Sequence, residues 1–357
     1  MPRPAALIVG GGPAGAAAGI VLAQAGVRPL LLERSRETGD ALCGGFLSWR
    51  SLETLAALGI DADALNPRRV TRVRIVYGER VAEAALPHGA VGVSRHRLDT
   101  LLLARAEAAG VGIERGVTVR SIAGRTAALA GGGSVEGEAL MLASGKHEVR
   151  GTARPAAARG DDPALGLRLR LPARPTLTAL VGDTIELHPF RGGYAGLVAQ
   201  EDGSINLCMA VRRSRLREAG DPAALFAALA VEAPRLGDRL AFAAGEPDAV
   251  ANVPYGWRAT ATTAGVYRLG DQAGVIPSLA GEGMGIALAT ARSAALALIA
   301  GEDAEVWQRR TAVALARPLR VAGWLRDVAE TRLGARVMAR APAALIRAGA
   351  RATRFVA

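Results

Sequence analysis

Two features of the sequence could do chemistry, and the first is a cysteine beside two glycines in DALCGGFLSW, residues 40–49. Cys43 and Cys208 are the only cysteines in the chain, which excludes a disulfide framework and a cysteine-rich zinc module. A thiol next to glycines can lie close to a redox cofactor, and its surroundings then set its pKa. A free cysteine is equally often a small core residue in a tight turn. Cys43 is therefore interpreted either as a reactive thiol or as a core thiol.

The second feature is the glycine-rich segment GGGPAGAAAG, residues 10–19, which follows a buried strand predicted for 5–9. Its Gly10-x-Gly12-x-x-Gly15 spacing is that of the dinucleotide-binding fingerprint. There the first glycine permits a tight turn, the second lets the backbone approach a pyrophosphate, and the third lets helix and strand pack closely. The helix predicted for 13–25 points its free N–H groups and positive dipole end at the phosphates.

An acidic residue lies at the end of the next buried strand, as the fingerprint requires. This strand is predicted for 28–32 and ends at Glu33, eighteen residues after Gly15. At that distance a carboxylate can accept a hydrogen bond from a ribose hydroxyl of adenosine. The strand, the helix, the glycines and the carboxylate together predict dinucleotide binding.

The elements that must position these groups lie at both ends of the chain, with a strand-rich block between them. Near the N-terminus we expect helices at 51–58 and 94–109, a hairpin at 70–77 and 80–86, and strands at 117–122, 127–129 and 134–143. The middle block has expected strands at 184–187, 194–200 and 204–211 and a helix at 222–232. This order predicts a discontinuous nucleotide-binding lobe (1–69, 90–155 and 252–302), an inserted substrate lobe (70–89 and 156–251) and a C-terminal Arg-rich helical segment (303–357).

Four motifs, GGGPAGAAAG, SRHRLDTLL, ASGKHEVRG and GDQAGVIPSLAGEGMGIAL, occur in the order typical of one superfamily. The chain resembles the FAD-dependent aromatic hydroxylases that are similar to p-hydroxybenzoate hydroxylase, over roughly residues 5–300. Within this superfamily it is most similar to the geranylgeranyl reductase-like branch, which also carries Cys-Gly-Gly after the second strand. The resemblance implies FAD as cofactor and an α/β (α+β) fold. That fold has a Rossmann-like, discontinuous FAD-binding lobe of the GR2 type, an inserted β-rich substrate lobe and C-terminal helices.

The resemblance also implies roles for individual residues. Asp271 of GDQAG would accept from the ribityl hydroxyls, and the loop 277–285 would run beside the isoalloxazine. A helix beginning near Met284 would stabilise negative charge on the reduced flavin with its N-terminus. Arg95 is either close to FAD or a surface arginine at a helix start. The predicted FAD-binding residues are Gly10, Gly12, Pro13, Ala14, Gly15, Glu33, Arg34, Gly44, Arg95, Gly270, Asp271, Gly281, Gly283 and Met284.

The third motif departs from the superfamily pattern. Ser144-Gly145 stands where the superfamily usually has Asp-Gly, a pair linked to both flavin and NADPH. The chain also has no second GxGxxG, so no dedicated NAD(P)H domain is predicted. We expect NAD(P)H to bind transiently as the electron donor, or another protein to reduce the flavin.

Two reactions are compatible with this flavin. In the first, a monooxygenase hydroxylates an electron-rich ring or polyene through a flavin hydroperoxide, with His188 and Tyr194 as candidate base or acceptor. Alternatively His188 satisfies a backbone carbonyl and Tyr194 packs in the sheet. In the second reaction, reduced FAD passes hydride to a carbon–carbon double bond and Cys43 supplies the proton. Cys-Gly-Gly favours the reductase and the make-up of the superfamily favours the monooxygenase.

Two further classes are less well supported. A non-enzymatic flavoprotein or interaction module would hold a flavin that nicotinamides and oxygen leave unchanged. A halogenase is not predicted, because the chain lacks Trp-x-Trp-x-Ile-Pro and the lysine expected near it.

Composition and charge restrict the partners. The net charge of +11 is concentrated after Trp307, where eleven arginines face Asp327 and Glu330. These helices either rest peripherally on an anionic membrane or present a solvated arginine face. Few aromatic residues and no binding motif argue against nucleic acid, and four scattered histidines give no metal-site spacing. We expect a cytoplasmic protein acting on a small lipophilic substrate, because two cysteines suit a reducing compartment and no targeting segment is evident.

Overall fold

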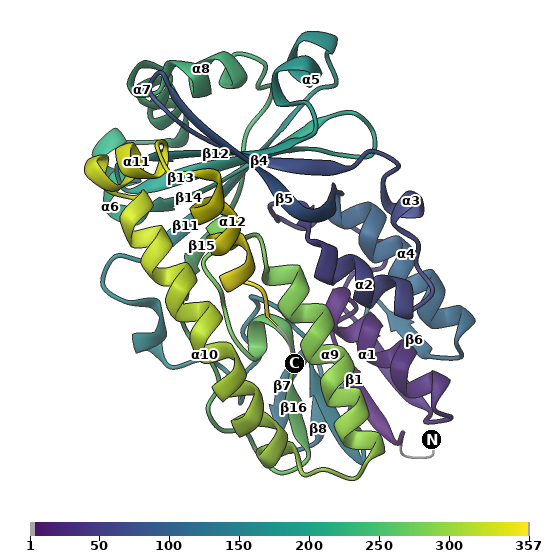
Figure 1. Ribbon diagram of the computed structural model, residues 1–357. Helices are drawn as coiled ribbons and strands as arrows, with labels where there is room; N and C mark the ends of the chain where they lie inside the picture. The colour runs from purple at the N-terminus through teal and green to yellow at the C-terminus, as the bar shows by residue number, and fades with distance from the viewer. Residues whose placement is uncertain (1–3, 356–357) are drawn as a thin grey trace.

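The computed structural model describes residues 4–355, which form two lobes joined along one side by a long helix (Figure 1). The lower lobe in that view contains a five-stranded parallel sheet in the order β16-β10-β1-β2-β6. Its strands are β1 (Ala6–Val9), β2 (Pro29–Glu33), β6 (Gly112–Arg115), β10 (Ala139–Leu142) and β16 (Val266–Arg268). The two first strands were predicted within a residue, whereas β6 was missed because a short, alternately exposed edge strand carries little apolar pattern.

Helices cover one face of this sheet and a smaller sheet covers the other. Ile8 of β1 packs with α1 (Pro13–Gln24), α4 (Arg95–Ala108) and α9 (Gly283–Ile299). Leu7 and Val9 point the opposite way, toward the three-stranded sheet of β7 (Val119–Ala123), β8 (Thr126–Leu129) and β9 (Ser134–Glu136). The single strand expected at 134–143 is therefore two strands in different sheets.

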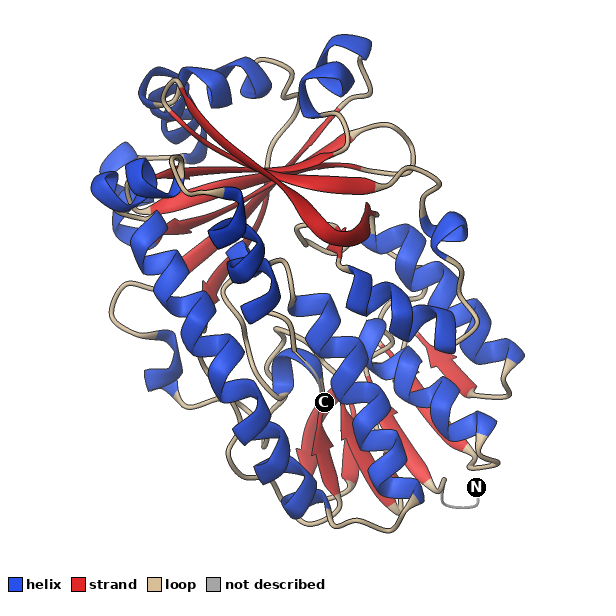
Figure 2. Cartoon of the chain, in the orientation of Figure 1, coloured by secondary structure: helices blue, strands red, loops and turns tan. Residues whose placement is uncertain are grey.

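The upper lobe is built on an eight-stranded sheet in the order β15-β11-β14-β13-β12-β4-β5-β3, drawn in red in Figure 2. Its strands are β3 (Phe46–Leu47), β4 (Val70–Tyr77), β5 (Arg80–Gly92), β11 (Ala164–Leu171), β12 (Thr184–Phe190), β13 (Gly193–Ala199), β14 (Ile205–Arg212) and β15 (Asp248–Val253). The face away from the lower lobe carries the core of this lobe, which packs against α5 (Pro175–Val181), α7 (Pro222–Glu232) and α8 (Pro234–Leu240).

Strand β5 runs six residues beyond the predicted end and connects the two lobes. At its end, a Cβ on Gly92 would lie 2.0 Å from the carbonyl oxygen of Ala199, so only glycine fits. β5 and β15 both cross predicted lobe boundaries, and β3 joins the upper sheet from the N-terminal segment. The remaining strands come from the segments expected to supply them, and the exact lobe boundaries stay a prediction.

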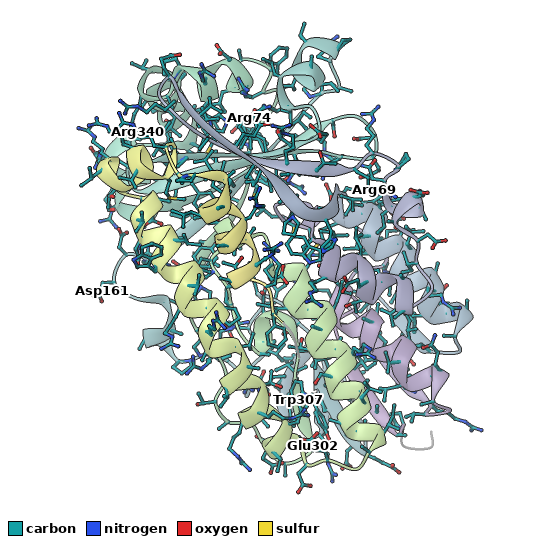
Figure 3. The ribbon with its side chains drawn as sticks, viewed as in Figure 1. Arg69, Arg74, Asp161, Glu302, Trp307 and Arg340 are labelled. Atoms are coloured by element: carbon teal, nitrogen blue, oxygen red, sulfur yellow. The ribbon has the colours of Figure 1, made fainter. Side chains whose placement is uncertain are left out.

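Three helices end the chain: α10 (Ala304–Ala329), α11 (Arg332–Met338) and α12 (Ala343–Ala352). α10 lies beside α9 in the lower lobe, with Trp307 fully buried between them, and extends to the upper lobe (Figures 1 and 3). There Glu330 binds Arg212 of β14 at 2.6 Å. α11 and α12 cover β4, β5 and β12 on the side toward the lower lobe. The other helices are α2 (Trp49–Ala57), α3 (Ala62–Leu65), α6 (Arg213–Ala219) and the 3₁₀ turns η1 (Ala156–Arg159), η2 (Gly270–Gln272) and η3 (Ser278–Ala280).

Candidate active site

The glycine-rich turn between β1 and α1 has the geometry that its sequence predicts. Gly10 has a φ of +107°, and its N–H donates to Leu32 O at 2.9 Å. A Cβ on Gly15 would lie 1.9 Å from Gly10 O, so a larger residue would push α1 away from β1. The turn leads directly into α1, whose N-terminus lies beside it. Pro13 and Ala14 begin that helix.

Glu33 is fixed against this turn by backbone donors. Its carboxylate accepts from Gly11 N at 2.7 Å and from Ser35 N at 2.8 Å. The next residue, Arg34, lies 2.6 Å from the imidazole of His147, which belongs to the third motif. Glu33 and Arg34 therefore occupy the edge of the turn where an adenosine ribose is expected.

Arg95 lies over the glycine-rich turn and is not a surface residue. Its Nη2 is 3.2 Å from the position of a Cβ on Gly12, and its side chain is 17% exposed. Asp99, one helical turn on, accepts two hydrogen bonds from the guanidinium at 2.9 and 2.7 Å. Burial works against the charged form of Arg95, but the Asp99 carboxylate raises its pKa above the ordinary value. The site thus holds a permanent positive charge beside the turn that is predicted to hold a pyrophosphate.

The fourth motif is packed directly against the first. Gly270 has a φ of +55°, and a Cβ there would lie 3.4 Å from Ala14 and 3.3 Å from Ala287. Its N–H donates to the hydroxyl of Thr290 on α9 at 2.9 Å. The GDQAG turn is therefore held between α1 and α9, which places Asp271 near the N-terminus of α1.

The third motif is joined to the fourth by side-chain hydrogen bonds. The carboxamide nitrogen of Gln272 lies within 3.0 Å of Ser144 Oγ, Gly145 O and His147 O. Arg154 donates to Gly145 O at 2.7 Å and to Asp271 O at 2.8 Å. Ser144, which replaces the usual aspartate, therefore serves here as a hydrogen-bonding residue within the turn.

Lys146, the only lysine of the chain, forms an ion pair with Asp271 at 3.1 Å. The Asp271 charge is the main cause of a pKa of Lys146 above its ordinary value, and Tyr255 and Cys43 also contribute. Sequence reasoning did not assign a role to Lys146, although a single lysine inside a recognised motif was a usable signal.

The Cys-Gly-Gly loop faces the same space. The carbonyl of Cys43 accepts from the Asn206 carboxamide at 3.0 Å, and a Cβ on Gly45 would lie within 3.2 Å of Asn206 and Gln200. A Cβ on Gly44 would meet open space, so the predicted FAD contact at Gly44 is sterically possible. Cys43 is half-buried and lies close enough to Arg95, Lys146 and Cys208 to interact electrostatically with them. The thiol therefore lies between the lobes, among charged groups of the predicted FAD site.

Cys208 lies on β14 toward the same space, on the face of the upper sheet that looks at the lower lobe. Burial raises the pKa of its thiol to about 12, with a further contribution from Cys43. Cys208 is therefore a neutral thiol at physiological pH and a poor nucleophile.

Three hydroxyl groups meet where the upper sheet approaches the loop 277–285. Tyr194 of β13 and Tyr255 both hydrogen-bond to Ser278 Oγ, the second at 2.6 Å. Burial raises the pKa of both tyrosines, so both stay protonated at neutral pH. Tyr194 was singled out from the sequence; Tyr255 and Ser278 were not, because nothing in their local pattern distinguishes them from core or turn residues.

His188 is a correction to the sequence analysis. It pairs with Ala195 across the hairpin, one position from Tyr194, so its side chain points to the opposite face of the sheet. There its Nε2 lies 3.2 Å from Glu186, which also accepts two hydrogen bonds from Arg239 of α8. His188 is 1% exposed, and burial lowers its pKa. It cannot reach a substrate between the lobes and belongs to a structural charge network.

The loop after Ser278 leads into α9 as the resemblance implies. Gly281 has a φ of +61°, and the helix begins at Gly283, one residue before the predicted start at Met284. Glu282 is fully buried, and a Cβ on Gly285 would lie 2.5 Å from its carboxylate. Glycine at 281 and 285 therefore shapes the loop and its buried carboxylate.

The residues present fit FAD. The glycine-rich turn is a cradle that a Cβ would fill, Arg95 supplies positive charge there, and Glu33 and Asp271 are acceptors for hydroxyl groups. The individual cofactor contacts stay predictions. Within residues 4–355, no three histidine, cysteine or acidic side chains are grouped so that they could hold a metal ion.

Comparison with known proteins gives a family match for the N-terminal part of the chain. Residues 3–149 match the family model for an FAD binding domain. This part of the chain is therefore similar to an FAD-binding domain. Among curated proteins, a probable electron transfer flavoprotein-quinone oxidoreductase, YdiS, of Escherichia coli is 31% identical over 161 residues, 41% of this chain and 37% of that protein. A chloroplastic geranylgeranyl diphosphate reductase of Oryza sativa is 34% identical over 118 residues, 32% of this chain and 24% of that protein. The aligned part thus spans well under half the length of these relatives.

Solved structures extend the similarity of the FAD-binding domain to the whole fold. The flavin-dependent brominase Bmp2 superposes with a TM-score of 0.74 at 16% identity over 99% of this chain and 94% of that one. Pseudomonas aeruginosa PqsL, solved with 2-aminobenzoylacetate, gives a TM-score of 0.73 at 17% identity over 94% and 99%. Halogenase PltM gives 0.74 at 14% identity over 90% and 75%. The flavoenzyme fold is confirmed, and the resemblance to geranylgeranyl reductases is supported over the aligned 118 residues.

Proposed function

We propose that the protein is an FAD-dependent monooxygenase that hydroxylates an electron-rich ring or polyene of a small lipophilic substrate. The FAD-binding domain and the flavoenzyme relatives support an FAD-dependent oxidoreductase. The cluster of Tyr194, Tyr255 and Ser278 hydroxyls carries the finer proposal, because it lies between the upper sheet and the loop predicted to face the flavin. When bound and reduced, FAD would supply the oxygen activation.

The hydroxyl cluster can bind and orient a substrate with a polar end. Tyr194 is 3% exposed, and both tyrosines are protonated at neutral pH, so the one that accepts from Ser278 can donate its own proton to a phenol or carbonyl oxygen. Ser278 Oγ accepts from one hydroxyl while it donates to the other, which allows a proton to pass along the three groups. Val198, on the same face of β13 as Tyr194, packs with Phe46 in a buried apolar cluster.

A second function is favoured by the position of Cys43. In a double-bond reductase of the geranylgeranyl reductase type, a thiol between the lobes would hold the proton that is delivered to carbon after hydride transfer. The similarity to geranylgeranyl diphosphate reductases over 118 residues supports this alternative.

Mixing reduced holoenzyme with oxygenated buffer in a rapid-mixing spectrophotometer tests the two proposals. A transient absorbing species that precedes the return of oxidised flavin supports the monooxygenase, above all if a phenol or polyene prolongs it. Direct reoxidation with every phenol or polyene tried, together with reduction of prenyl double bonds, supports the reductase. In that case Cys43→Ala should keep FAD bound and lose turnover, while Cys208→Ala serves as the matched control. A flavin that neither reduces nor reoxidises would contradict both.

The electron donor is proposed to be NAD(P)H, bound transiently. Ser144 and Gly145 of the third motif already hydrogen-bond to Gln272 of the fourth motif, so we expect weak nicotinamide binding. The test is to measure the rate of anaerobic flavin reduction at increasing concentrations of NADH or NADPH. A rate that does not respond to either would point to reduction by a protein.

Peripheral contact with an anionic membrane is proposed as the route of substrate delivery. No helix within residues 4–355 is long and apolar enough to cross a membrane. Val313 and Trp324 of α10 are 76% and 65% exposed, and Arg317 and Arg320 lie on the same stripe by helical spacing. Neither arginine forms an ion pair within the described residues.

Exposed Trp and aliphatic side chains beside unpaired arginines suit the interface of an anionic bilayer. Flotation of holoenzyme with phosphatidylglycerol-containing vesicles should succeed and should fail with phosphatidylcholine alone. Arg317→Glu/Arg320→Glu should abolish flotation, whereas Arg120→Glu, an exposed residue of β7, should not. Equal flotation of all variants would overturn the proposal.

A further inference from the structure

The last described residues of the chain bind the loop 277–285, far from them in sequence. The Arg354 guanidinium forms an ion pair with Glu282 and donates to Ala280 O at 2.6 Å and Gly281 O at 3.3 Å. Three consecutive residues of the loop are thus held by one side chain, which is 8% exposed.

Phe355 holds the same loop through its backbone and its ring. Its N–H donates to Glu282 Oε1 at 3.3 Å, and the ring is 3% exposed within a cluster that includes Ile276 and Ile286. Ser48, just after the Cys-Gly-Gly loop, donates to the other oxygen of Glu282 at 3.3 Å. The Glu282 carboxylate therefore receives donors from the C-terminus and from the N-terminal segment at once.

Arg354 also contacts the start of α2. Its guanidinium lies 5.5 Å from the ring centre of Trp49, a cation–π contact. An arginine with a carboxylate, two carbonyls and an aromatic ring as partners has one available geometry, so its position is strongly determined.

The loop that Arg354 holds is the one whose other end carries the hydroxyl cluster. Ser278, which binds Tyr194 and Tyr255, is two residues before Ala280. The loop is thus fixed at one end by tyrosines on the substrate side and at the other end by the C-terminus. Gly281, one of the residues that Arg354 holds, has a φ of +61° and no side chain of its own to fix the loop.

We propose that Arg354 is a positioning residue that sets the conformation of loop 278–282 against the flavin, so that the C-terminal segment completes the active site. This proposal rests on the proposed function, because it assumes that the loop faces FAD. Its substrate-side consequence is that the Ser278 hydroxyl reaches the tyrosines only while Arg354 holds Glu282.

The test compares FAD affinity, visible flavin spectrum and midpoint potential in purified full-length variants. Arg354→Ala leaves Glu282 buried without its cation and can fail to fold, so the decisive variant is Arg354→Gln/Glu282→Gln, which has no unpaired charge. We expect this variant to fold, to bind FAD about tenfold or more weakly and to show a shifted flavin spectrum. Arg354→Lys keeps the positive charge beside Glu282 but not the guanidinium contacts with the two carbonyls, so its FAD affinity should lie between those of the double variant and wild type.

The matched control is Arg351→Ala in the last turn of α12, three residues before Arg354; the Arg351 side chain is exposed and forms no ion pair within the described residues. It should match wild type in all three measurements. FAD affinity, spectrum and potential unchanged in the folded double variant would overturn the positioning role. Failure of wild type itself to bind FAD would instead overturn the proposed function.

Discussion

The two faces of the eight-stranded sheet use polar residues in opposite ways. On the outer face, Glu186 is buried beneath α8 in ion pairs with Arg74 and Arg239, and His188 hydrogen-bonds to its carboxylate; Arg74 is labelled in Figure 3. On the inner face, Tyr194 directs its hydroxyl to Ser278 on the loop of the other lobe. Both His188 and Tyr194 come from one short hairpin, and only the alternation of the strand separates them.

This difference shows that the face on which a residue lies, and not its type alone, decides whether its side chain can take part in the reaction. Histidine is the more usual catalytic residue at neutral pH, yet His188 hydrogen-bonds to a buried carboxylate on the face that is turned away from the other lobe. The outer network serves stability, and the inner hydroxyls remain available to a ligand. Variants on the two faces should therefore separate stability from turnover.

The largest effect is expected from Glu186→Gln on the outer face. Glu186 is fully buried and pairs with both Arg74 and Arg239; the substitution leaves Arg239 without a carboxylate partner, whereas Arg74 keeps Glu83. The free energy of unfolding should fall by about 3–5 kcal/mol, measured by urea unfolding of the holoenzyme. FAD affinity at low urea should stay at the wild-type value. Wild-type stability would show that the network does not hold the outer face.

A substitution on the inner face should lower turnover and leave stability almost unchanged. Tyr194→Phe removes only the hydroxyl that meets Ser278, and turnover should fall by about a hundredfold, the lower end for loss of a proton-transferring group. Unfolding free energy should change by no more than about 1 kcal/mol. Tyr77→Phe on β4, whose hydroxyl has no hydrogen bond within the described residues, is the control. Equal losses of turnover in both variants would contradict a special role for Tyr194.

The pH dependence of the unfolding free energy should test the outer face in the absence of any ligand. Burial raises the pKa of Glu186, but hydrogen bonds from His188 and Arg239 lower it to about 2 overall, against an ordinary 4.5. Because the folded pKa is depressed, this stabilisation is complete above about pH 4.5 and is lost as pH falls toward 2. The stability gap between wild type and Glu186→Gln should shrink by about 2 kcal/mol between pH 7 and pH 3. A gap that does not change with pH would show that Glu186 is not ionised in the fold.

The FAD-binding turn was predictable from sequence because its constraints are local. Gly10, Gly15 and Glu33 act within one strand–helix–strand unit, where spacing alone determines geometry. The hydroxyl cluster and the Arg354 contact join residues far apart in the chain, and no local pattern records such pairs. The same limit explains the wrong prediction for His188. Alternation along a strand shows which residues share a face, but it does not show which of the two faces is turned toward the other lobe.

The smallest effect is expected from His188→Gln, and it tests the assignment of faces most directly. Glutamine can still donate to Glu186, so the substitution costs little more than imperfect packing in a buried site. Unfolding free energy should fall by about 1 kcal/mol, and turnover should stay within about twofold of wild type, since the side chain points away from the site. A catalytic histidine would instead lower turnover by about a hundredfold or more while leaving stability unchanged. That outcome would mean that β12 presents its other face to the substrate, and it would remove Tyr194 from the site by the same alternation.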